Sequence, residues 1–555
     1  MSTPLAAERT RGAARPRSGV LLLPHGGARS LSRRERVWLA VALVGAFAFL
    51  VWGIGRPSLW YDEIATLSAS ARSLPDLFAL TGQVDAVHGA YYTLMHAVVA
   101  VLGESETALR LPSAACAALA SAGVYALARR FAGVAPSAGA AVLFLLLPRT
   151  TWMAVEARSF AVFSLVLIAL GLVWVQALVA PRRWPWAVAY GVLAWLSVSL
   201  YLFTALVVAA QVLALLGALA LRPSARAALW ARTWPLLVAA AIAAAASVPL
   251  AGWVSAQQGQ LGGTRPISTH TPAQLAVEAL FLTSRPGALA AIALVSLAIA
   301  VVAVRLARAR INAARTSEPV NTAVAAEGTV TVPVGWFLWS WAILPPAALI
   351  GVTAAGTVVF QPRQLTMIAP ALCIGAALLI FRAAPRPAAW VAVALIAALC
   401  APVWWFTRAP EAKGTDWREV AQTLSATATP GDAVVFSPSW ISGAAVRYAT
   451  PLIPLAYPET RGFDEPALVR TPLDAQSLFG DRYPLADIDL SGRDRIWLVS
   501  SRAAEIDAVS SGSAQTEEGD SAARVAADRA TLEAAGFHLD DSIETPLSRL
   551  ELWTR

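Results

Sequence analysis

The sequence has few charged residues: aspartate, glutamate, lysine and arginine make up 14% of its 555 residues. Soluble globular domains carry about 25% of these residues, and long apolar runs account for the difference. A polytopic membrane protein is therefore predicted. The formal net charge of +8 does not indicate a nucleic-acid partner. Many of the arginines lie in short loops between the apolar runs, as the positive-inside rule predicts for a membrane protein.

Cysteine and histidine are also scarce, with three and five residues respectively. Cys116, Cys373 and Cys400 all fall within apolar runs, where buried structural thiols are expected. A disulfide framework or a zinc cluster is therefore not predicted. No group of histidine, cysteine and aspartate residues has the spacing of a metal site. No cofactor is predicted, and a divalent metal bridging Asp85 and a phosphate group stays an open alternative.

About eleven apolar runs are candidates for crossing a bilayer, which takes about 20 residues. The first is Arg36–Ile54. No small-residue cleavage site follows it, so we expect it to be retained rather than removed as a signal peptide. Pro136–Leu147 is short and is the weakest candidate. The other runs are Ala108–Leu127, Phe160–Ala180, Trp186–Phe203, Ala205–Leu221, Trp234–Val254, Gly287–Val304, Val334–Val352, Leu365–Phe381 and Ala388–Phe406.

Arginine clusters between these runs predict the orientation. A basic tail, residues 1–35, precedes the first run and is expected in the cytoplasm, with loop 56–107 outside. The protein is expected in the plasma membrane. Cytoplasmic and outer loops then alternate along the chain, provided that the amphipathic stretch Gly89–Gly103 lies flat on the outer interface of the membrane and does not cross the bilayer. The polar segment 305–333 is predicted to be a cytoplasmic linker.

The composition changes near Glu411, where polar residues rise and apolar runs shorten to strand length. We predict an extracytoplasmic α/β domain over residues 407–555, which is large enough to form its own core. Its predicted elements are a helix at Asp416–Leu424, a strand at Ala433–Phe436, a strand at Arg495–Ser500, a helix at Ala522–Ala535 closed by Gly536, and a final strand at Leu547–Trp553.

The residues that could carry chemistry all fall on the predicted outer side. Asp62 and Glu63 follow the first apolar run directly, in the segment Leu59-Trp60-Tyr61-Asp62-Glu63. Carboxylates are costly close to a bilayer, so this pair indicates catalysis or ion binding at one membrane face. The alternative is a solvated interfacial loop.

Other polar residues of the outer loops lie at the ends of apolar runs. Candidate substrate or phosphate ligands are Asp85, His88, Tyr92, Glu156, Arg158 and Arg363. Carboxylates and cations from segments that are far apart in the sequence are thus predicted to lie at the same, outer face of the membrane. Two simpler interpretations stay open: Arg158 could only snorkel at the end of a run, and His88 could be an interfacial hydrogen-bonding residue.

The order of these motifs resembles bacterial family-39-type glycosyltransferases of the GT-C fold, which are similar to protein O-mannosyltransferases and to the lipid A aminoarabinose transferase. The resemblance covers mainly Trp52–Ala180, with a weaker match at Gln361–Gln364. It departs from the family pattern after His88, where relatives often have His-Pro-Pro and this chain has Gly89-Ala90. The motifs that carry it are Leu59–Glu63, Asp85 with His88 and Tyr91-Tyr92, Gly103–Glu106, Leu109–Ser113 and Glu156–Phe160.

This resemblance implies a GT-C catalytic domain over residues 36–406. It also implies the reaction of this family, which is transfer of a sugar, most commonly mannose, from a polyprenyl-phosphate donor to a glycan, lipid or protein acceptor at the extracytoplasmic face. Asp62 matches the proposed catalytic base of the family. Glu63 is expected to orient Asp62 or a substrate hydroxyl, or alternatively to cap the helix that follows.

The chemistry of such a transfer agrees with these residue types. Phosphate leaves as a weak base, so one carboxylate that takes the acceptor proton is sufficient. A cation must then stabilise the charge that grows on the departing phosphate. Arginine suits this role through bidentate contacts, which makes Arg158 and Arg363 the candidates.

Two other classes of function stay open. A secondary transporter or lipid flippase would need charged residues at the membrane midplane, whereas the apolar runs are nearly free of aspartate, glutamate and lysine. A non-catalytic scaffold whose outer domain binds a partner would keep its function after Asp62→Asn.

Overall fold

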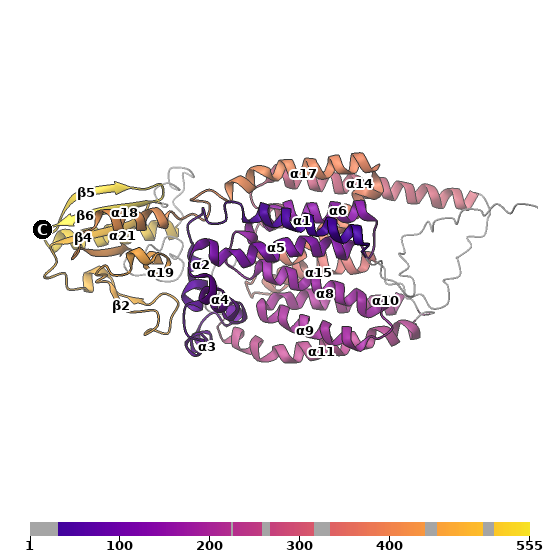
Figure 1. Ribbon diagram of the computed structural model, residues 1–555, viewed down its shortest axis with the longest axis horizontal. Coiled ribbons are helices and arrows are strands. Elements are labelled where there is room, and N and C mark those ends of the chain that lie inside the picture. Colours follow the sequence, from indigo (N-terminus) through magenta and orange to yellow (C-terminus); the bar gives the residue numbers. More distant parts are fainter. Residues whose placement is uncertain are drawn as a thin grey trace, which may run out of the picture.

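The computed structural model describes residues 31–221, 223, 226–257, 267–315, 334–438, 452–502 and 516–555. Figure 1 shows a long bundle of helices with a smaller domain of strands and helices beyond one of its ends. Residues 1–30 of the predicted N-terminal tail and residues 316–333 of the predicted linker lie outside the described residues.

The bundle is built from helices that correspond to the predicted apolar runs. They are α1 (Arg33–Val51), α5 (Glu106–Ala128), α6 (Val134–Leu146), α7 (Pro148–Ala154), α8 (Phe160–Val179), α9 (Trp184–Leu200), η2 (Leu202–Thr204), α10 (Ala205–Leu221), α11 (Arg226–Ala256), α14 (Arg285–Arg315), α15 (Val334–Ala354), η6 (Pro362–Ile368), α16 (Ala369–Ala383) and α17 (Arg386–Phe406).

Within the described residues, eight helices are long and apolar enough to cross a membrane, or nine if the bent pair α6 and α7 forms one span. The pair bends by 58° where Pro148 opens α7, because proline has no N–H to continue the helical hydrogen bonds. The predicted crossings also included α1, which begins with charged residues, and α9, which has 17 residues. Both pack in the bundle, α1 against α5 and α9 against α8 and α11.

One predicted boundary was wrong. The predicted linker begins too early, because α14 continues as a helix through Arg305–Arg315. Alanine and arginine dominate that stretch, and both are strong helix formers even where the sequence is too polar for a membrane span.

Short helices cover the end of the bundle that faces the smaller domain (Figure 1). The first loop supplies α2 (Tyr61–Ser70), α3 (Leu74–Gln83), η1 (Ala86–His88) and α4 (Gly89–Leu102), and the segment between α11 and α14 supplies α12 (Thr271–Ala273), η5 (Gln274–Glu278) and α13 (Ala279–Phe281). The 14-residue α4 includes the amphipathic stretch and is too short to count among the spans. Its contact with a membrane surface stays a prediction.

The opposite end of the bundle carries the predicted arginine clusters. Arg129 pairs with Glu35 there at 2.7 Å, and Arg305 donates to the carbonyl of Arg382 at 3.0 Å. Clusters from several loops therefore share one end, as the alternation of apolar runs requires. The assignment of this end to the cytoplasm stays a prediction.

The C-terminal part forms a four-stranded sheet with the order β1-β4-β6-β5. β1 and β4 are parallel, and the other neighbours are antiparallel. The main elements are α18 (Trp417–Thr427), β1 (Ala433–Ser437), β4 (Arg495–Ser501), α21 (Thr516–Ala534), β5 (His538–Glu544) and β6 (Ser548–Thr554), and the smaller ones are α19 (Ile453–Ala456), η9 (Pro458–Thr460), β2 (Leu468–Arg470), β3 (Asp481–Arg482) and η10 (Leu485–Asp487).

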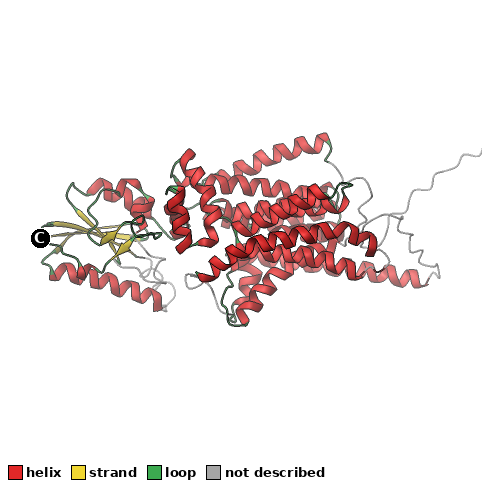
Figure 2. Cartoon of the chain, turned by 90° about the horizontal axis from the view of Figure 1, so that it is seen from below, coloured by secondary structure: helices red, strands yellow, loops and turns green. Residues whose placement is uncertain are grey.

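Apolar side chains cover both faces of this sheet, because successive residues of a strand point to opposite sides. Phe436 packs in the same core as Trp417 of α18, whereas Val435 packs with Leu532 of α21. Figure 2 shows the strands between helices. The predicted helices and strands of this domain are confirmed, including the end of α21 before Gly536, which has φ +88° and suits a helix C-terminus.

Candidate functional site

Asp62 and Glu63 lie in the first turn of α2, at the end of the bundle next to the sheet domain. Trp60 precedes the helix in an extended conformation and provides no side-chain cap, so the two carboxylates complement the positive end of the helix dipole. The Thr66 hydroxyl donates to the carbonyl of Ala157 at 3.0 Å and holds α2 against the turn before α8. Both acidic residues are buried.

Two arginines surround the Asp62 carboxylate. Arg363 of η6 donates from Nη1 to Oδ2 at 2.5 Å, and Arg158 Nε lies 3.9 Å from the same oxygen. Burial alone would raise the pKa of Asp62, but the charges of Arg363 and Arg158 outweigh it and lower the pKa to about 2. Asp62 is therefore ionised. The Arg363 side chain is 34% exposed, so this ion pair remains accessible at one side.

Arg158 continues the contacts into the first loop. Its Nη2 lies 2.7 Å from His88 Nε2, and its Nη1 donates to the Tyr92 hydroxyl at 3.4 Å. Arginine is only a donor, so Nε2 of His88 accepts and the ring is neutral with its proton on Nδ1. Burial and the Arg158 charge lower the pKa of His88 to about 3. Its buried Nδ1 has no hydrogen-bond partner among the described residues.

Asp85 completes this chain of contacts. Its Oδ2 accepts from the Tyr92 hydroxyl at 2.7 Å. Asp85 has a φ of +56°, a left-handed conformation that aspartate tolerates better than most residues. The helix η1 begins after Asp85, and Asp85 is connected to His88 through Tyr92 and Arg158.

Glu63 and Asp62 have different partners. Its two oxygens accept from Nε and Nη2 of Arg110 at 2.7 and 2.6 Å, and both side chains are fully buried. Oε1 also accepts from the backbone N–H of Ala157 at 2.9 Å. The other Arg110 hydrogen bonds go to the carbonyls of Ile54, Pro57 and Ser58. These contacts connect α5 to the segment that leads into α2.

Glu156 lies in the turn between α7 and α8 and is 3% exposed. Burial raises its pKa, and the charge of Lys413 partly opposes this shift. Lys413 follows α17, and its Nζ lies 3.8 Å from the ring centroid of Trp152. This Nζ is buried without a hydrogen-bond partner in the part of the chain that the structure describes. The segment that enters the sheet domain therefore places a cation beside the site.

The structure brings most of the predicted residues together. Asp62, Asp85, His88, Tyr92, Arg158 and Arg363 form one connected set of contacts. Glu63 pairs outside this set with Arg110, and Glu156 approaches it through charge interactions. Among the described residues, no group of three or more histidine, cysteine, aspartate or glutamate side chains could hold a metal ion.

Sequence reasoning gave no role to Lys413 or Arg110. Lys413 is the only lysine in the chain, and this was a signal that could have identified it. Arg110 belongs to the motif Leu109–Ser113 that contributes to the resemblance. Its partner could not be recognised, because 47 residues separate it from Glu63.

No protein-family model matches the sequence, and no curated protein matches it. The apo structure of ArnT from Cupriavidus metallidurans is similar, with a TM-score of 0.54 and 12% identity over 94% of this chain and 98% of ArnT. The structure of the same protein bound to undecaprenyl phosphate gives a TM-score of 0.48 and 12% identity over 93% and 98%. At this identity the first likeness shows the fold alone, which is the GT-C membrane fold.

Proposed function

We propose that this protein is a membrane glycosyltransferase that moves a sugar from a polyprenyl-phosphate donor to an acceptor at the extracytoplasmic face. The observation that carries the proposal is the buried Asp62 carboxylate between Arg158 and Arg363, which come from segments far apart in the chain. The GT-C fold and the order of the sequence motifs support the same class of reaction. The resemblance favours mannose as the sugar and a glycan, lipid or protein as the acceptor.

The two arginines are proposed to bind the phosphate of the donor. A phosphate monoester or diester accepts several hydrogen bonds, and guanidinium groups meet it in bidentate geometry. Arg363 is the first contact because its side chain is partly exposed. The Nδ1–H of His88, which has no partner in the part of the chain that the structure describes, is a further donor for the substrate. Tyr92 and Asp85 then act as positioning residues for Arg158.

Asp62 is proposed to be the general base. With two arginines beside it the carboxylate is a weak base, since its pKa is about 2. An anionic donor that draws Arg363 and Arg158 toward its phosphate would weaken their contacts with Asp62 and raise this pKa. Donor binding would thus prepare the base, which would couple acceptor activation to the presence of the donor.

The transfer can be written with all bonds balanced. The acceptor oxygen attacks the anomeric carbon of the sugar and forms the new glycosidic bond. The bond between that carbon and the phosphate oxygen breaks, and its electron pair leaves with the phosphate, where arginine charge stabilises it. The acceptor proton moves to Asp62. Glu63 is proposed as a positioning residue, since its ion pair with Arg110 fixes the start of α2.

The decisive experiment measures transfer of radiolabelled sugar from polyprenyl-phosphate donors in membranes containing the protein or its Asp62→Asn variant. We expect the variant to lose at least about 10²-fold in rate, the lower range for a general base. Asp76→Asn is the matched control, because Asp76 lies in the first turn of α3 and bonds to Ser73 outside the site. Its rate should not change.

The same assay separates the rival functions. Transfer that survives in Asp62→Asn would remove the assignment of the base. Absence of transfer by the unmodified protein with mannosyl and other polyprenyl-phosphate donors would favour a transporter, a flippase or a scaffold.

A further inference from the structure

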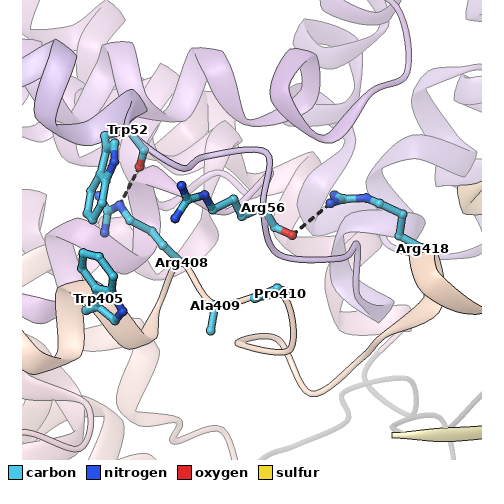
Figure 3. Close-up of a pocket in the computed structure, with 7 residues that line it drawn as sticks. All are labelled: Trp52, Arg56, Trp405, Arg408, Ala409, Pro410 and Arg418. Atoms are coloured by element: carbon cyan, nitrogen blue, oxygen red, sulfur yellow. Dashed lines mark hydrogen bonds between the residues drawn. The ribbon is translucent and has the colours of Figure 1, made fainter. Parts of the chain in front are cut away.

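A cavity lies beside the junction between the helix bundle and the sheet domain. It has a volume of about 470 Å³ and is lined by Trp52, Arg56, Trp405, Arg408, Ala409, Pro410 and Arg418 (Figure 3). These residues come from the segments that follow α1 and end α17, and from the first turn of α18. None of them belongs to the set of contacts around Asp62. Its volume is sufficient for a small polar group.

The cavity concentrates positive charge. Arg418 has a carboxylate partner, since its Nη2 lies 2.6 Å from Glu106 Oε1. Among the described residues, Arg56 and Arg408 have no such partner. The Arg408 side chain donates to the carbonyls of Trp52 and Trp404 at 2.7 and 2.8 Å, and burial lowers its pKa to about 10, so it stays charged at neutral pH.

Arg56 is exposed and its side chain reaches into the same space. Its guanidinium carbon lies 5.9 Å from the centroid of the Trp52 ring, and the corresponding distance for Arg408 is 5.3 Å. Figure 3 shows the Arg56 side chain directed toward Arg408 and Trp52, away from Arg418. Two guanidinium groups that approach one aromatic ring without a carboxylate between them repel each other. An anion in this cavity would relieve the repulsion.

The position of the cavity indicates which kind of anion it could bind. Trp52 and Trp405 are 40% and 68% exposed at the ends of two adjoining helices, α1 and α17. Large exposed tryptophans at helix ends are typical of the level of the lipid headgroups. Both helices also expose apolar side chains along their length, including Val41, Val44 and Leu395, which suits contact with acyl chains.

We propose that this cavity binds the phosphate headgroup of an anionic phospholipid in the same leaflet as the Asp62 site. Arg56 and Arg408 contact the phosphate, and the tryptophans flank the glycerol region. Because Arg408 also bonds to carbonyls at the C-terminal ends of α1 and α17, the bound lipid strengthens the junction between these two helices. The site does not depend on the sugar-transfer reaction.

The test is native mass spectrometry of the full-length protein in mixed micelles of phosphatidylglycerol and phosphatidylcholine. We expect retention of phosphatidylglycerol over phosphatidylcholine, and a loss of about fivefold in its affinity for Arg56→Gln, as expected for one arginine–phosphate contact near a membrane surface. Arg56→Lys should retain most of the affinity. Arg408 is not substituted, because its carbonyl contacts make misfolding the expected result.

The control is Arg285→Gln, an exposed arginine at the start of α14 and outside the cavity. It should bind phosphatidylglycerol as the unmodified protein does. Equal loss in both variants, or no preference for phosphatidylglycerol, would overturn the proposal. A separate arm adds inorganic phosphate: competition at millimolar concentration would show that the site recognises free phosphate and would overturn the lipid assignment. Sugar transfer measured in parallel reports on the Asp62 site alone.

Discussion

Lys413 is the residue whose surroundings are hardest to explain by packing alone. A buried ammonium without a hydrogen bond is costly, yet its Nζ lies over the Trp152 ring and interacts with the charges of Glu156 and Glu63. Burial lowers the pKa of Lys413, and the two glutamates oppose this shift. Cation–π attraction and charge compensation therefore hold the side chain next to the proposed active site.

A double-mutant cycle tests this coupling. Lys413→Met and Glu156→Gln should each destabilise the protein, and the double variant should lose less than the sum, with a coupling energy of about 1 kcal/mol. Thermal unfolding in detergent measures the effect. The exposed pair Arg461 and Glu104 is the control, with an expected coupling below about 1 kcal/mol. Additive effects of Lys413 and Glu156 would show that their charges do not interact.

His88 predicts a pH dependence of stability. Its pKa is about 3 in the folded protein and about 6.5 in an unfolded chain. Between these values the unfolded state binds a proton that the folded state does not, so stability rises with pH from about 3 to about 6.5. Acidification from pH 7 to pH 5 should therefore lower the melting temperature of the unmodified protein.

The variant His88→Gln removes this contribution, so its melting temperature should fall less over the same pH range. The slope that disappears is about 1.4 kcal/mol per pH unit where the unfolded histidine is fully protonated. His270→Gln, at an exposed position, serves as the control. If His88→Gln and the unmodified protein lose stability in parallel, His88 is not held neutral by its surroundings.

At the scale of single elements, α2 depends on the ion pair between Glu63 and Arg110. The guanidinium satisfies three carbonyls before α2, and the carboxylate also accepts from Ala157 at the turn before α8. One buried pair thus connects α5, the segment leading into α2 and the turn that carries Arg158. The geometry around Asp62 requires all of these segments to be in place.

Glu63→Gln should therefore cost about 3–5 kcal/mol, because it leaves the Arg110 charge buried without compensation. Chemical denaturation of the purified protein would measure the loss. Asp481→Asn breaks the exposed pair with Arg470 and should change stability by less than about 1 kcal/mol. A similarly small effect of Glu63→Gln would mean that water or another group replaces the carboxylate.

Elements were predictable where the apolar pattern was strong. β1 and β4 contain continuous apolar runs of strand length and were predicted from them, whereas β5 was missed. Its sequence contains Asp540 and Asp541, residues that are depleted in strands, and it is an exposed edge strand for which no apolar alternation is needed. The bundle helices followed from length and apolarity, and the break at Pro148 needed three-dimensional information.

The sequence predicted that the site residues lie at one end of the bundle, but it did not predict which of their side chains pair with each other. The alternation of apolar runs placed Asp62 and Arg363 at the same end of the bundle, and the structure brings them into contact. The choice of Arg110 as the partner of Glu63 depends on how α2 packs against α5, which periodicity does not encode. The same limit applies to Lys413, whose place beside Trp152 and Glu156 depends on how the segment after α17 packs.

At the scale of the whole molecule, the sheet domain holds the backbone just before Asp62. The Tyr457 hydroxyl accepts from the N–H of Leu59 at 3.0 Å and donates to Glu106 at 3.1 Å. Thr415 donates to the carbonyl of Leu59 at 2.9 Å. Both hydrogen-bonding groups of Leu59 therefore bond to the C-terminal part of the chain, three residues before the proposed base.

Tyr457→Phe removes the hydroxyl and leaves the buried N–H of Leu59 without its acceptor, at a cost of about 1–3 kcal/mol. Because the disturbed segment leads directly into α2, we expect the transfer rate to fall about tenfold, while the helical content measured by circular dichroism stays the same. Tyr483→Phe is the matched control, since Tyr483 is 52% exposed on the same domain. Equal rates for the two variants would show that the sheet domain does not position Asp62.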